Sequence, residues 1–250
     1  MDPLETFRRI YGQVPDWAEV MHEWAPEALR HYTALRMAVL EDGALARKDK
    51  ELILVGINAA RRYETSMLYH TQGAHDAGAT AAEVAETVLT AVISRGLPAW
   101  LEGRKAVAFA VERERQMSGQ TTVVAPSPAP AQRQMTTVEE CEAYYRHAFG
   151  DIPGWASLMR DVQPDIFISY TNLRSACLRP GTLSPKVKEL VLTGINAAER
   201  YPLGVEIHAR GALEKGATRA ELAECLLTAV LTAGIPAWFT GYSFLAGPDA

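Results

Sequence analysis

Apolar residues recur along this chain at the spacing of helices that face a core, and turn signals separate the runs. Pro15 and Pro26 break the first runs, and Thr80 with Glu83 forms a capping box that begins a later helix. No Asn-Gly or Asp-Gly pair stands between two alternating apolar runs, as a β-hairpin would require. The pattern predicts an all-α fold. The expected helices cover residues 4–11, 16–24, 26–41, 47–62, 66–77, 81–95 and 99–117.

The chain contains one domain twice, with the copies offset by about 138 positions. YGQVPDWAEVM, from Tyr11, aligns with FGDIPGWASLM, from Phe149, and KDKELILVGINAARRY aligns with KVKELVLTGINAAERY. Residues 118–134, between the copies, are rich in Pro, Ala, Ser and Thr, which is typical of an extended or disordered linker. We expect a first domain over residues 1–117, this linker, and a second domain over 135–250 that packs on the first as an intrachain pseudo-dimer.

The helix expected at 47–62 is apolar on almost every side, which indicates burial, yet it carries a polar stripe. At 100° per residue, Glu51, Asn58 and Arg62 fall close to one line. The second copy repeats the stripe with Glu189, Asn196 and Arg200. Burying such groups costs several kcal/mol unless they pair or face a wet cavity. The stripe is therefore either a buried Glu–Arg network or the wall of a pocket.

A histidine on the next helix favours the pocket. His70 and His208 each follow the stripe's glutamate by 19 residues, and they recur while their immediate neighbours differ between the copies. An imidazole beside a buried carboxylate suits proton transfer near neutral pH.

The order K-x-x-E-L, His on the next helix, G-A-T-x-x-E and G-I/L-P-A resembles the carboxymuconolactone decarboxylase family, over residues 45–103 and 183–241. The resemblance implies two tandem AhpD-like helical domains. The peroxidase branch of that family places two cysteines between the Glu and the His. Here those positions hold Tyr63 and Ser66 in the first copy, and Tyr201 and Gly204 in the second. Dithiol peroxide reduction is therefore excluded.

The resemblance then implies a cofactor-independent lyase that decarboxylates a small carboxylated cyclic substrate by acid–base chemistry. His70 and His208 are expected to return a proton to carbon, with Glu51 and Glu189 orienting the rings. The residues expected to bind substrate are Arg62, Asn58, Tyr63, Ser66 and Trp100, and in the second copy Arg200, Asn196, Tyr201 and Trp238, with Arg36 and Arg174 as alternative arginines. The recurring pairs Trp17/Trp155 and Tyr32/Tyr170 are interpreted as core or interface anchors.

Two other functions stay open. Ser66 lies one helical turn before His70, so a Ser–His contact in a hydrolase is possible, and an isomerase could use the same pocket. A non-catalytic binding or assembly module is the third hypothesis.

Composition and motifs argue against several classes of ligand and partner. A net charge of −5 argues against nucleic acid, and three widely spaced cysteines form neither a disulfide framework nor a zinc site. No long apolar run points to a membrane and no phosphate loop to a nucleotide, so we expect a cytoplasmic protein that needs no metal or cofactor. The resemblance implies a homotrimer with six domains, or a higher homo-oligomer.

Overall fold

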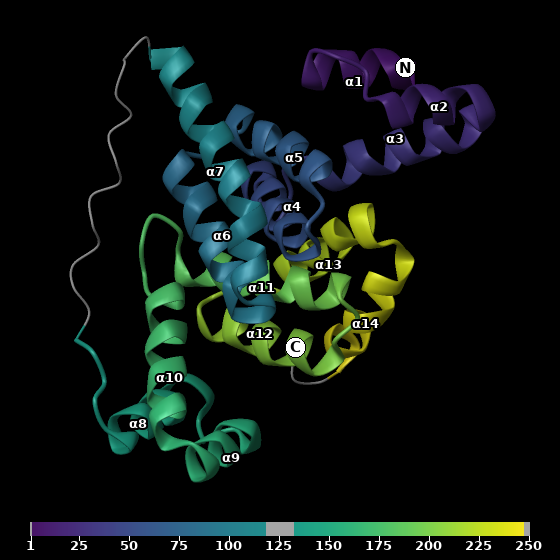
Figure 1. Ribbon diagram of the computed structural model, residues 1–250. Coiled ribbons are helices and arrows are strands. Elements are labelled where there is room, and N and C mark those ends of the chain that lie inside the picture. Colours follow the sequence, from purple (N-terminus) through teal and green to yellow (C-terminus); the bar gives the residue numbers. More distant parts are fainter. Residues whose placement is uncertain (1, 119–132, 248–250) are drawn as a thin grey trace.

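The computed structural model describes residues 2–118 and 133–247, and this part of the chain contains helices and no strands (Figure 1). The first copy comprises α1 (Pro3–Tyr11), α2 (Asp16–Trp24), α3 (Pro26–Leu40), α4 (Arg47–Arg61), α5 (Glu64–Asp76), α6 (Ala81–Arg95) and α7 (Leu97–Ser118). The second comprises α8 (Val138–Phe149), α9 (Gly154–Val162), α10 (Pro164–Leu178), α11 (Pro185–Ala198), α12 (Pro202–Glu214), α13 (Arg219–Ala233) and α14 (Ile235–Ala246). The all-α prediction is confirmed, and the expected helix ends lie within about two residues of the observed ones.

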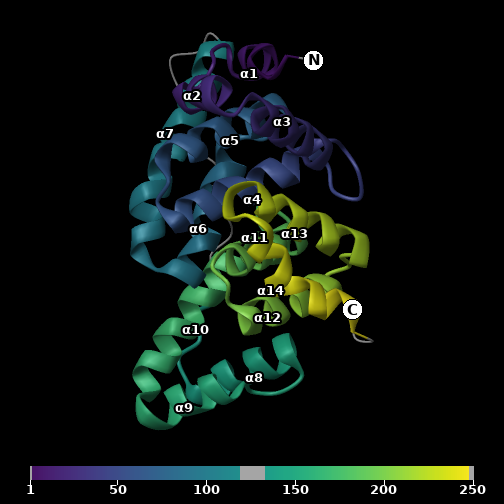
Figure 2. The ribbon, with the colours of Figure 1, turned by 90° about the vertical axis from the view of Figure 1, so that its right-hand side faces the viewer.

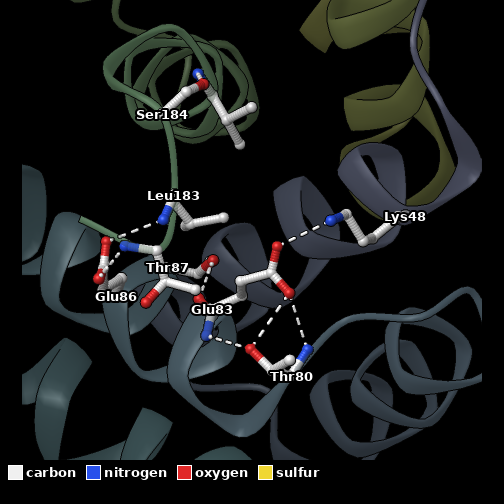
Figure 3. A network of polar contacts seen from close by, with 9 residues as sticks. Lys48, Thr80, Glu83, Glu86, Thr87, Leu183 and Ser184 are labelled. Carbon is white, nitrogen blue, oxygen red and sulfur yellow. Dashed lines mark hydrogen bonds and ion pairs between the residues drawn. The ribbon is translucent and has the colours of Figure 1, made fainter. Parts of the chain in front are cut away.

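The predicted capping box of Thr80 and Glu83 is present. The Glu83 amide donates to Thr80 Oγ1 at 3.2 Å, and the Thr80 amide donates to the Glu83 carboxylate at 2.8 Å (Figure 3). Lys48 of α4 binds the other oxygen of Glu83 at 2.8 Å. The capping box that begins α6 therefore also ties α6 to the central helix of the same copy.

The two copies pack through their central helices, α4 and α11 (Figure 1). Gly56 and Gly194 lie at this crossing, where a Cβ on Gly56 would stand 2.7 Å from Val191 and one on Gly194 would stand 2.7 Å from Ile53. Only glycine lets the helices approach this closely, and the residues around the crossing form one continuous apolar core. The pseudo-dimer is therefore built from a shared core and not from two separate ones.

Reciprocal carboxylate clamps add polar contacts between the copies. Glu224 of α13 accepts hydrogen bonds from the amides of Ala44 and Leu45, each at 2.9 Å, and pairs with the buried Lys50 at 2.9 Å. Glu86 of α6 does the same for Thr182, Leu183 and Lys188 in the second copy, and Figure 3 shows its bond with Leu183. Each clamp holds the loop that precedes the central helix of the other copy.

The first three helices of each copy form an arm, and the two arms lie at opposite ends of the molecule (Figures 1 and 2). The apolar cluster of the first arm, α1–α3, includes Tyr69 of α5. The cluster of the second arm, α8–α10, is drawn from residues 135–168 alone. The first arm therefore closes over its domain, whereas the second forms its own small core.

The predicted linker lies almost entirely in residues 119–132, outside the described residues, so the domain limits stay predictions. None of the helices in the described ranges is long and apolar enough to cross a bilayer.

The clamps predict a specific loss of stability. Glu224→Gln keeps the shape of the side chain but leaves the ammonium of Lys50, which is 3% exposed, without its carboxylate partner. Removing one partner of such a contact costs about 1–3 kcal/mol, and Glu86→Gln should cost a similar amount because its contacts match. Urea unfolding measures the effect, with the exposed Glu19→Gln as control. A free energy of unfolding equal to that of the control would refute the clamp.

Candidate functional site

Each copy holds a buried carboxylate that is paired with an imidazole. Glu51 of α4 accepts a hydrogen bond from Nδ1 of His70 on α5 at 2.7 Å, and both side chains are at most 4% exposed. Glu189 and His208 repeat the pair at 2.8 Å on α11 and α12. With Nδ1 used for this contact, Nε2 is the ring nitrogen left for another partner.

A glycine on the facing helix makes room for each carboxylate. A Cβ on Gly73 of α5 would press into the carboxylate of Glu51, nearer than real Cβ atoms approach other groups. Gly211 of α12 takes the same place, where a Cβ would stand 3.0–3.1 Å from the carboxylate of Glu189. The close approach of the two helices therefore brings the histidine within hydrogen-bond reach of the carboxylate.

The second oxygen of each carboxylate faces a cation that comes from a different helix in each copy. Nε of Arg47, at the start of α4, stands 3.6 Å from Oε1 of Glu51. In the second copy Pro185 takes that position, and Lys215 at the end of α12 pairs with Oε1 of Glu189 at 3.1 Å. Lys215 in turn corresponds to Ala77. Each carboxylate thus has a cation beside its second oxygen, which α4 supplies in the first copy and α12 supplies in the second.

These surroundings lower the pKa of both partners. Burial raises the pKa of Glu51, but the hydrogen bond from His70 and the charges of Arg36 and Arg47 outweigh it, so the pKa lies below its usual value. Burial and the charge of Arg36 lower the pKa of His70. In the second copy burial raises the pKa of Glu189, but the contact with His208 and the charges of Lys215 and Arg174 outweigh it and bring the pKa to about 2. The resting pair is therefore a carboxylate beside a neutral imidazole at neutral pH.

His70 lies in the wall of a cavity of about 360 Å³ between the first arm and α5. The buried Arg36 of α3 faces this cavity and donates a hydrogen bond to the hydroxyl of Tyr11. Leu231 and Thr232 of α13 complete the wall, so the second copy contributes to the site of the first. Six aromatic side chains line the cavity: Phe7, Tyr11, Trp17, Tyr32, Tyr63 and Tyr69. Such a cavity suits a flat ring that carries an anionic group.

A family model for the carboxymuconolactone decarboxylase family matches residues 26–109 and 164–246, which together make up more than half of the chain. The chain belongs to the carboxymuconolactone decarboxylase family. Both matches include a Glu–His pair, and the tandem arrangement expected from the repeat is confirmed.

Solved structures from Burkholderia xenovorans LB400 are similar to this member of the family. One, a "putative gamma-carboxymuconolactone decarboxylase subunit", is 21% identical over 98% of this chain and 95% of that chain, with a TM-score of 0.63. This likeness shows the fold. Another, a "putative carboxymuconolactone decarboxylase", is 35% identical over 48% of this chain and 93% of that chain, with a TM-score of 0.44. No curated protein matches the chain.

The expected alignment of Arg62 with Glu51 and Asn58 is wrong. Helix α4 ends at Arg61, and Arg62 adopts a left-handed backbone conformation with φ of 57°. The amides of Arg62 and Tyr63 there donate to the carbonyls of Ala59 and Asn58, which closes the helix end. Arg62 is exposed as a result, and Arg200 has the same conformation with φ of 58°. The arginine that faces the pair is Arg36, which the sequence offered only as an alternative.

The asparagines of the stripe are buried but turned toward their own helices. Asn58 donates to the carbonyl of Leu54 at 2.7 Å, and Asn196 donates to that of Leu192 at 2.8 Å. Asn196 also donates to Ser94 of the first copy at 3.3 Å. Neither asparagine lines the aromatic cavity.

The structure places some of the aromatic residues that were expected to bind substrate in the cavity and others outside it. Tyr63 and Ser66 line the cavity beside His70, as expected. Trp100 and Trp238 pack against the central core, away from this cavity, whereas Trp17 and Tyr32 line it. Tyr201 is half-exposed.

Sequence reasoning missed Tyr11 as part of the site, and it placed Tyr69 near His70 without counting it among the residues expected to bind substrate. Tyr11 begins the repeated segment, and its counterpart is Phe149, while Tyr69 corresponds to Ile207. A search for polar side chains that are present in only one copy would have found both. The rings lie 4.5 Å apart between centroids, which joins α1 to α5 at the cavity.

The three cysteines lie away from this site, and burial raises the pKa of each thiol, to about 12 for Cys225. In the described part of the chain, no group of three or more His, Cys, Asp or Glu side chains could hold a metal ion.

The lowered pKa values predict that acid destabilises the protein. The pKa of His70 lies lower in the folded protein than its value near 6.5 in the unfolded chain. At a pH between these two values the unfolded chain binds more protons than the folded protein, so the free energy of unfolding falls as the pH drops below about 6.5. One such group contributes a slope of up to about 1.4 kcal/mol per pH unit. Urea unfolding at pH 7.5, 6.5 and 5.5 should show this slope, and His70→Gln should reduce it. Replacing the exposed His22 by Gln is the control, and an equal slope in His70→Gln and the wild type would contradict the prediction.

Proposed function

We propose that the cavity of the first copy is the active site of a cofactor-independent decarboxylase that acts on a small carboxylated cyclic substrate, a lactone acid. The observation that carries the proposal is His70, whose Nδ1 is held by a buried carboxylate while the ring lines an aromatic cavity beside Arg36. The membership of the family and the name of the solved structure from Burkholderia xenovorans LB400 support this substrate class.

In this proposal Arg36 and the aromatic rings position the substrate. The guanidinium binds a carboxylate, and the rings hold the lactone so that the C–C bond to the departing carboxylate lies across its π system. When that bond breaks, CO₂ leaves and the electron pair passes onto the ring carbonyl as an enolate. A ring carbon of this enolate then takes a proton from Nε2 of His70.

Glu51 keeps the imidazole oriented and stabilises its protonated form. At rest the pKa of His70 is lowered, but an anionic substrate beside the ring raises it and favours uptake of a proton from water. Each turnover consumes one proton for each CO₂ released, and water returns the proton to His70. No electron acceptor or metal enters this balance.

The reaction is assigned to the first copy because the second has lost polar groups on this face. Tyr11, Ser66 and Tyr69 correspond to Phe149, Gly204 and Ile207. Glu189 and His208 keep the pair, so the second copy retains the proton-transfer geometry without the same lining.

A second candidate, hydrolysis of a lactone, rests on Ser66. Ser66 and His70 line the same cavity, one helical turn apart, and Glu51 holds Nδ1 as the acid of a Ser–His–acid triad does. A hydrolase would use Ser66 as the nucleophile and His70 as its base.

His70→Gln tests the decarboxylase. Glutamine keeps an amide that can donate to Glu51 but provides no titrating proton, so turnover should fall at least about 1,000-fold while the protein stays folded. The assay is CO₂ release from a carboxylated muconolactone in D₂O, where the wild type should place one deuterium on a ring carbon of the product.

Ser66→Ala separates the two candidates. A decarboxylase should lose less than about tenfold, whereas a hydrolase should lose nearly all activity and the wild type should react with a fluorophosphonate. Full CO₂ release by His70→Gln would refute the proton-donor role.

We also propose that three chains assemble into a ring of six domains. Large apolar side chains are exposed at equivalent positions of both copies, which favours an interface used twice per chain. The pairs are Val20/Leu158, Trp24/Val162, Leu35/Leu173, Leu89/Leu227, Leu97/Ile235 and Leu101/Phe239.

Mass photometry should therefore give a particle of three 27.4-kDa chains. Introducing charge with Leu101→Glu and Phe239→Glu should shift the mass toward one chain, because both side chains lie on the equivalent apolar faces of α7 and α14. Gln13→Glu, at an exposed polar position, is the control. A wild-type mass of one chain would refute the ring.

A further inference from the structure

Each copy has a cavity beside its buried arginine, and in the first copy this cavity is distinct from the aromatic one. In the first copy it measures about 470 Å³ and is lined by Arg9, Arg36 and Arg47 together with Glu41, Asp42 and Asp76. In the second copy the equivalent cavity measures about 670 Å³ and extends inward to Glu189. The two cavities have equivalent walls but different charges.

Three replacements add positive charge to the second cavity or remove negative charge, while Arg9 and Arg47 correspond to His147 and Pro185. Glu41 corresponds to Arg179, Asp42 to Pro180 and Ala77 to Lys215. The first cavity therefore balances three arginines with three carboxylates, whereas the second sets Arg174, Arg179 and Lys215 against Glu189 and Glu214, with His147 also in the wall. Phe149 and Ile207, the counterparts of Tyr11 and Tyr69, also line the second cavity.

The carboxylate inside the second cavity is already satisfied. Glu189 accepts from His208 at one oxygen and pairs with Lys215 at the other, so it presents no unpaired oxygen to a ligand. Glu214 lies exposed on the rim. The wall therefore holds three cations against two carboxylates, an excess of one positive charge that the equivalent wall of the first copy lacks.

The buried arginine adds a donor. Arg174 is 4% exposed, stacks on Phe149 at 5.2 Å, and its Nε has no hydrogen-bond partner in the described part of the chain. The ring of Tyr144 also lines the cavity, where the first copy has Thr6. A buried guanidinium with an unused N–H favours a carboxylate ligand.

We propose that this cavity of the second copy is a binding site for a small multiply charged carboxylate, such as a di- or tricarboxylate, and is separate from the reaction site of the first copy. Arg179 and Lys215 attract the anion at the mouth, and Arg174 binds one carboxylate inside. The proposal does not depend on decarboxylation, because it rests on the charges and cavity of α10–α12 alone. The duplication thus supplies two sites of different chemistry in one chain.

Isothermal titration of the full chain with citrate, at an ionic strength held constant with NaCl, tests the site. The wild type should bind one citrate per chain, with a Kd below about 1 mM. Arg179→Gln and Lys215→Met should each weaken binding, and the double variant should weaken it at least tenfold. Constant ionic strength removes the general screening of surface charge.

Glu41→Gln, at the position equivalent to Arg179, is the matched control and should leave the citrate affinity unchanged. The unliganded variants should keep the wild-type circular dichroism spectrum, because both replaced side chains lie at the mouth of the cavity. Arg179→Gln leaves the Glu189–Lys215 pair intact, so it reports on the ligand even if Lys215→Met perturbs that pair. The absence of saturable binding to the wild type, or unchanged affinity in the double variant, would overturn the proposal.

Discussion

A carboxylate buried in the second turn of an apolar helix is the constraint on which the site depends. Glu51 and Glu189 lie on the two central helices, whose other side chains form the shared core. An isolated carboxylate there would cost several kcal/mol, so each needs a hydrogen-bond donor and a nearby cation. The imidazole is the hydrogen-bond donor, and the need for this donor explains why a histidine and a close-packed glycine recur on the facing helix.

The cation beside the carboxylate comes from a different helix in each copy. The first uses Arg47 from the start of its central helix, and the second uses Lys215 from the end of the next helix. Either cation keeps the carboxylate ionised, but the two cations stand on different sides of the Glu–His pair. The walls around the pair were then able to diverge, toward an aromatic cavity in one copy and a cationic cavity in the other.

Fusion of the two copies matters to the site as well as to the fold. The glycines at the crossing of α4 and α11 bring the central helices into contact, and the clamps of Glu86 and Glu224 hold the loops of the opposite copy. This packing places Leu231 and Thr232 in the wall of the first cavity. A single copy without its neighbour would leave that cavity open on one side.

The helices, the duplication and the Glu–His pairs could be predicted from the sequence, because periodicity, capping boxes and internal repetition are local or directly comparable signals. Tertiary structure alone decided which arginine faces the pair. The left-handed turn at Arg62 carries its side chain outward, since the end of a helix depends on how the chain reverses toward α5. The arm then brings Arg36, Tyr11 and Trp17 over His70 through contacts between distant helices, which no local pattern records.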